Sequence, residues 1–92
     1  MSAEVETAIF DLLGAKEAGK SIAPEDVARK MDAKAWRRLL GHVRAVARGL
    51  ARQRKLVILR HNKPADPDDF RGVYRIRLPL PDDVIPTEGD DA

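Results

Sequence analysis

Arginine and lysine are the side chains of this sequence best placed to do chemistry, and that chemistry is the binding of a polyanion. No acidic residue interrupts the stretch from Lys34 to Gln53. Arginine can hydrogen-bond bidentately to guanine O6 and N7 or to phosphate, and a glycine lets the helix backbone approach a groove wall. The stretch therefore predicts a nucleic-acid-binding face made of Lys34, Arg37, Arg38, Gly41, Arg44 and Arg48.

A second, weaker basic group follows in the stretch from His61 to Gly72. Lys63 and Arg71 are predicted to contact backbone phosphate or the minor groove. Three aspartates in the same stretch, Asp66, Asp68 and Asp69, would repel phosphate, and forming turns or pairing with Arg60 or Arg75 is their alternative role. They also lack the spacing, the glycine and the terminal glutamate of an EF-hand calcium loop.

Metal binding and catalysis have little support in the sequence. The chain has no cysteine, and its two histidines, His42 and His61, lie far apart with no neighbouring carboxylate to orient an acid or base. It also lacks a glycine-rich phosphate loop. We therefore expect no metal, no cofactor and no enzymatic activity.

The element that must carry the basic face is a long helix over Lys34 to Gln53. Its apolar residues recur at three- and four-residue steps, which places them on one stripe of a helix facing the core. The arginines and Gly41 then fall on the opposite side. The stripe consists of Trp36, Leu39, Leu40, Val43, Val46, Ala47 and Leu50.

Two shorter helices are predicted before it. The first spans about residues 3–18, with Gly19 as a left-handed stop, and the second begins at Pro24 and ends near Met31. A short edge strand at residues 20–22 separates them. Asp32 is expected to cap the long helix.

The remainder of the chain predicts a β-hairpin and a tail. Residues 56–59 read as a buried strand, and residues 73–78 as its partner, with Arg75 and Arg77 on a common solvent face. The intervening residues 61–72 are too many for a two-residue turn and predict a projecting loop. Residues 79–92 contain three prolines and five acids, which predicts a flexible acidic tail after a single domain over residues 1–78.

Charge is strongly segregated along the 92 residues. Residues 34–64 carry ten basic and no acidic side chains, although the net charge of the whole chain is only +2. No apolar run approaches the roughly 18 residues that a membrane span needs, and no signal peptide is evident. These features predict a cytoplasmic protein with no membrane contact.

The order helix, short strand, helix, helix, strand, loop, strand is that of a winged helix-turn-helix. The segments GKSIAPEDVARK, WRRLLGHVRAVARGL, ILR and DPDDFRGVYRIRL and the final proline also resemble a family of small bacterial winged-helix domains of unknown function. The likeness covers about residues 5–79. It implies an α+β, mainly helical fold of three helices and a small antiparallel β-hairpin wing, and it carries no functional residue over.

Two functions follow as hypotheses. The first is a double-stranded DNA-binding protein, such as a transcriptional regulator, that places the basic helix in the major groove. The second is a protein–protein interaction module on the same scaffold, with the acidic tail screening the arginine face or marking a protein partner. A homodimer is compatible with either hypothesis, although no dimer seam stands out.

Overall fold

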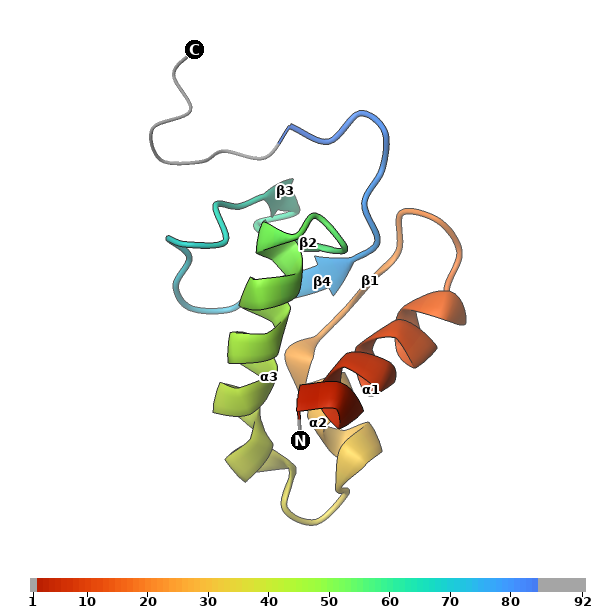
Figure 1. The fold of residues 1–92 in the computed structure, drawn as a ribbon, viewed down its shortest axis with the longest axis vertical. Coiled ribbons are helices and arrows are strands. Elements are labelled where there is room, and N and C mark those ends of the chain that lie inside the picture. Colours follow the sequence, from red (N-terminus) through yellow and green to blue (C-terminus); the bar gives the residue numbers. More distant parts are fainter. Residues whose placement is uncertain (1, 85–92) are drawn as a thin grey trace.

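The computed structural model describes residues 2–84, which form three helices and a small sheet (Figure 1). The helices are α1 (Ser2–Gly14), α2 (Pro24–Met31) and α3 (Trp36–Arg52). The strands are β1 (Ser21–Ile22), β2 (Val57–Arg60), β3 (Lys63–Pro64) and β4 (Arg75–Arg77). All strand pairs are antiparallel, and the sheet order is β1-β4-β2-β3.

A row of isoleucines joins the sheet to the helices. Ile76 of β4 lies in register with Ile22 of β1 on one side and Ile58 of β2 on the other. All three side chains are at most 1% exposed and belong to one core with the apolar faces of the helices. The short edge strand predicted at residues 20–22 is thereby confirmed.

The apolar stripe of α3 is confirmed as its core face. Val43, Ala47 and Leu50 are buried, and the other predicted members of the stripe pack against the same core as half-buried side chains. In α1, Val5, Ile9 and Leu13 are buried at four-residue steps. The basic side chains of α3 therefore lie outside this core-facing stripe.

Two predicted helix boundaries change. Helix α1 ends at Gly14 instead of residue 18, although Gly19 does adopt the expected left-handed conformation, with φ of 86°. Helix α3 begins at Trp36 because Asp32 shapes a turn before the helix. The Asp32 carboxylate accepts hydrogen bonds from the backbone N–H groups of Lys34 and Ala35, each at 3.0 Å.

The C-terminus of α3 closes in a Schellman motif. The N–H of Lys55 donates to the carbonyl of Leu50, and the N–H of Arg54 donates to the carbonyl of Ala51. Arg54 stands at the left-handed position that glycine usually fills, with φ of 62°. The chain then reverses into β2.

The prediction of a projecting loop over residues 61–72 is wrong in two respects. First, β2 and β3 form a tight hairpin whose two turn residues, His61 and Asn62, both have positive φ, which suits the twist of the strands. Second, residues 65–72 return along α3, where Phe70 is buried. Figure 1 shows this segment beside the half of α3 nearest the sheet.

The prediction that Arg75 and Arg77 share a wet face is also wrong. Arg77 is only 8% exposed, because residues after β4 fold back over it. Its guanidinium donates to both carboxylate oxygens of Asp83, at 2.8 and 2.5 Å, and to the carbonyl of Leu78. Part of the predicted tail thus contacts the sheet, while residues 85–92 lie outside the described range.

The fold is α+β and mainly helical, with three helices and a four-stranded antiparallel sheet. Its element order and the packing of α2 on α3 are consistent with a winged helix-turn-helix. Between residues 2 and 84, no helix is long and apolar enough to cross a membrane.

Candidate nucleic-acid interface

The cations of α3 divide into two groups with different surroundings. Lys34, in the turn before the helix, and Arg37 and Arg38, in its first turn, are exposed. Within residues 2–84, none of the three forms an ion pair with a carboxylate within 4.0 Å. We call Lys34, Arg37, Arg38 and Gly41 the basic N-terminal half of α3.

Asp32 is the carboxylate closest in sequence to this half. Its oxygen is held by the backbone N–H groups of Ala35 and Lys34, and these bonds, with the nearby charge of Arg38, hold its pKa below the usual value. Asp32 therefore stays ionised and fixes the turn from which the basic residues project.

Towards the C-terminus of α3, the arginines contact residues 65–72, a segment we call the returning loop. Arg52 donates from Nε to Oδ1 of Asp68 at 2.6 Å, and the Arg48 guanidinium lies 3.5 Å from the same oxygen. The prediction that all the arginines stand outward together is therefore wrong at this end of the helix.

Arg44 is held by the same loop in a different way. Its guanidinium donates to the carbonyl of Phe70 and stacks 4.0 Å from the centroid of the Phe70 ring. Tyr74 packs edge-on to Phe70, with ring centroids 5.1 Å apart, and burial raises the pKa of its phenol to about 12. Arg44 thus ties the returning loop to α3 and is only half exposed.

Gly41 is the last residue of the basic N-terminal half and lies on an exposed part of the helix. A Cβ atom built there would meet no heavy atom within 4 Å outside its own helix backbone and chain neighbours. No packing contact in the described fold explains the glycine, whose cost in a helix is about 1 kcal/mol relative to alanine. It leaves a smooth, accessible stretch of helix beside Arg37 and Arg38.

Two guanidinium groups stack on the ring of Trp36. The Cζ atoms of Arg29 and Arg37 lie 4.4 and 4.5 Å from the ring centroid. Arg29, from α2, also lies 3.5 Å from Glu25. The indole is half-buried at the edge of the core, so its expected core role is only partly fulfilled.

The two predicted wing contacts are exposed but are not joined to the basic N-terminal half. Lys63 stands on β3 at the sheet edge, and Arg71 stands in the returning loop. Among residues 2–84, neither makes a side-chain hydrogen bond or an ion pair. Both remain accessible to a ligand.

The sequence did not predict the structural role of the returning loop, which is to contact the arginines of α3. Asp68 neutralises two arginines, and Phe70 anchors the loop against Arg44. A signal was present in the sequence, because Phe70 is a single aromatic residue in an otherwise polar, aspartate-rich stretch. Such a side chain usually has a buried partner.

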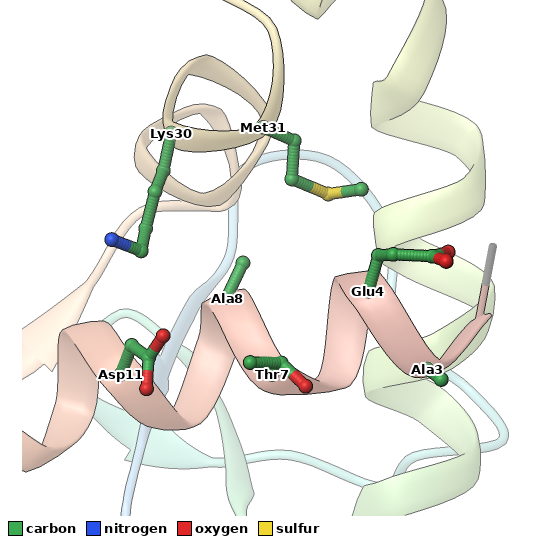
Figure 2. A pocket seen from close by; sticks show the side chains of 7 residues that line it. All are labelled: Ala3, Glu4, Thr7, Ala8, Asp11, Lys30 and Met31. Atoms are coloured by element: carbon green, nitrogen blue, oxygen red, sulfur yellow. The ribbon is translucent and has the colours of Figure 1, made fainter.

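A cavity of about 360 Å³ lies between α1 and α2, lined by Glu4, Thr7, Asp11, Lys30 and three apolar residues (Figure 2). In Figure 2, Met31 extends from α2 over α1, while Lys30 lies on the side of Asp11. Within residues 2–84, no three histidine, aspartate or glutamate side chains cluster as metal ligands would.

Comparison with known proteins assigns a family but no activity. No functionally curated protein matches the chain. Residues 2–79, nearly all of the described fold, match the family described as "protein of unknown function (DUF3253)", and the chain belongs to that family.

Proposed function

We propose that this protein binds double-stranded DNA through the basic N-terminal half of α3, with the helix lying in the major groove. In helix-turn-helix proteins, the N-terminal residues of the second helix meet base edges and neighbouring cations meet phosphates. Lys34, Arg37 and Arg38 occupy that position. We extend the proposal to a cytoplasmic location and to a role in transcriptional regulation.

The observation that carries the proposal is the exposure of these three cations beside an open Gly41. Cations that serve only the fold are usually paired with acids or packed along apolar surface, as Arg52 and Arg44 are here. Arg37 does stack on the ring of Trp36, but among the described residues no cation of the basic N-terminal half lies within 4.0 Å of a carboxylate. A close-packed polyanion would supply an anionic partner, and the missing Cβ of Gly41 would let it approach.

The proposal gives the other predicted cations secondary roles. Arg44 and Arg48 hold the returning loop, so they would contribute to DNA affinity only when the loop moves. Lys63 and Arg71 would contact backbone phosphates at the edge of the site, where they add affinity without sequence preference.

The experiment is a fluorescence-anisotropy titration of a labelled duplex at several salt concentrations. The test variant is Arg37→Ala with Arg38→Ala. The matched control is Lys16→Ala with Lys20→Ala, because both lysines are exposed and lie outside α3, and the loss of charge is equal. Each lost phosphate contact makes the slope of log K against log salt shallower by about 0.9.

We expect the arginine variant to weaken binding at least tenfold and to flatten the slope by one to two contacts, about 0.9–1.8. The lysine control should keep nearly the wild-type affinity. Equal losses in both variants would show attraction by net charge alone, and unchanged binding in both would remove α3 as the contact surface.

An apolar cleft beside Trp36 favours a second candidate function, the binding of a protein segment. This cleft is built from residues that the basic N-terminal half does not include. Arg37 stacks on Trp36 at the edge of the cleft, so the two functions are separated by substituting Arg38 on one side and Val73 on the other.

A further inference from the structure

A cleft of about 440 Å³ opens between the start of α2, the first turns of α3 and the residues just before β4. Its size lies within the roughly 300–1,000 Å³ of clefts that bind small ligands. Most of its lining is apolar and comes from Pro24, Trp36, Leu40, Val73 and Tyr74.

The cleft exposes apolar surface that the fold does not cover. Val73 is 82% exposed, and Trp36 and Leu40 are half-buried at the edge of the core. Contiguous apolar surface with a polar rim is a mark of interaction sites, and tryptophan, tyrosine and arginine dominate the binding energy at such sites.

The backbone around the cleft is held in place. Arg60 donates to the carbonyl of Val73, and its guanidinium packs against Gly72, which has a φ of 75°. Arg75 donates from Nε to the hydroxyl of Ser21 at 2.7 Å and from its terminal nitrogen to the Ser21 carbonyl. Val73 is therefore presented on a fixed backbone.

The rim of the cleft is mainly cationic. Arg75 belongs to the lining, and the guanidinium groups of Arg29 and Arg37 stack on Trp36. Glu25 is the single acid in the lining, and it pairs with Arg29. The charge complementary to this rim is negative.

We infer that the cleft binds an acidic segment of a partner protein, which inserts one large apolar side chain between Trp36, Leu40 and Val73. The flanking carboxylates would pair with Arg75 and with the two arginines stacked on Trp36. A nucleic-acid backbone fits this place poorly, because burying phosphate against apolar side chains removes its hydration without replacing it. The inference does not depend on the proposed DNA contact.

The test begins with a displayed library of random nine-residue peptides, selected in parallel on the intact protein and on Val73→Asp. Val73→Asp places a carboxylate at the mouth of the cleft. The control is Val84→Asp, because Val84 is also 82% exposed and does not line the cleft. Selected peptides are then synthesised and titrated by fluorescence of Trp36, the only tryptophan in the chain.

We expect the selected peptides to share one Phe, Leu, Ile or Trp flanked by Asp or Glu. Their binding should shift the Trp36 emission saturably, weaken at least tenfold in Val73→Asp and remain unchanged in Val84→Asp. Replacing the apolar residue of the peptide by alanine should abolish the shift.

Several results would overturn the inference. These are selection of the same peptides on Val73→Asp, selection of basic or uncharged peptides, or equal losses in both variants. A wild-type dimer that Val73→Asp converts to monomer would show that a second copy occupies the cleft. Failure of the DNA proposal is distinguishable, because Arg38→Ala should weaken duplex binding without changing peptide binding, and Val73→Asp should do the reverse.

Discussion

Arg52, in the last turn of α3, donates from Nε to Oδ1 of Asp68 at 2.6 Å, across sixteen residues of sequence. The carboxylate also lies 3.5 Å from Arg48, so one acid of the returning loop holds two arginines of the helix. All three side chains are about half exposed, and pairs of this kind contribute only about 0–1 kcal/mol to stability. The contact with Asp68 therefore shields the two arginines only in part, and breaking it costs little free energy.

Asp68→Asn should increase affinity for duplex DNA, because it frees Arg48 and Arg52 to contact phosphate. The slope of log K against log salt should steepen by up to about 1.8, corresponding to two new contacts. Asp69→Asn is the control, since it removes the same charge from a neighbouring exposed residue. Equal gains in the two variants would mean that net charge, not the release of the arginines, sets the affinity.

Gly41→Ala should raise the stability of the protein but lower its affinity for duplex DNA. Alanine favours the helix, and no neighbour would clash with the new methyl group, so the free energy of unfolding should rise by about 1 kcal/mol. Duplex affinity should fall, because the methyl group projects from the proposed contact face. Gly49→Ala, also without a neighbour within 4 Å, should stabilise the helix and leave affinity unchanged. Unaltered binding by Gly41→Ala would argue against close approach at this point.

Arg54→Gly should stabilise the protein against urea. The residue ends α3 in the left-handed conformation, which costs a side chain with a Cβ atom about 1–2 kcal/mol. Arg54→Ala provides the control, because it removes the same charge but keeps the Cβ atom. If alanine stabilises as much as glycine, charge repulsion near the helix end, rather than backbone strain, is the cause.

Asp83 should make stability depend on acid pH. The hydrogen bonds from Arg77 hold the pKa of this carboxyl below its usual value, and its side chain is only 9% exposed. The unfolded chain then takes up a proton first as pH falls, so the stabilisation is fully present above about pH 4 and is lost as pH falls through the lowered pKa.

Asp83→Asn should remove that part of the pH dependence and cost about 2 kcal/mol at neutral pH, because Arg77 is left buried without its carboxylate. Denaturant unfolding between pH 2 and pH 7 measures both effects. Asp82→Asn, at an exposed neighbour, should change neither. A wild-type acid transition that survives in Asp83→Asn would place the titrating group elsewhere.

The sequence predicted those parts of the fold that depend on local periodicity. The apolar stripe of α3 follows from spacing alone, since the helical repeat sets the face on which each side chain lies. The tight turn at His61 and Asn62 was missed because neither residue is the glycine that such turns favour.

Contacts between distant segments could not be derived in this way. Alternation predicts that Arg77 faces away from Ile76, but it does not reveal that Asp83 folds back to cover that side. The pairing of Asp68 with Arg52 likewise depends on the path of the returning loop. Consequently, the sequence predicted a continuous arginine face, and the structure divides it into an exposed half and a covered half.

The central claim is that the basic N-terminal half of α3 contacts duplex DNA. Amide chemical-shift mapping of the ¹⁵N-labelled protein with an unlabelled duplex at low salt tests it most directly. The account predicts saturable shifts concentrated at Lys34 to Gly41, with weaker shifts near Lys63 and Arg71. Shifts confined to another surface, or no saturable change at all, would contradict it.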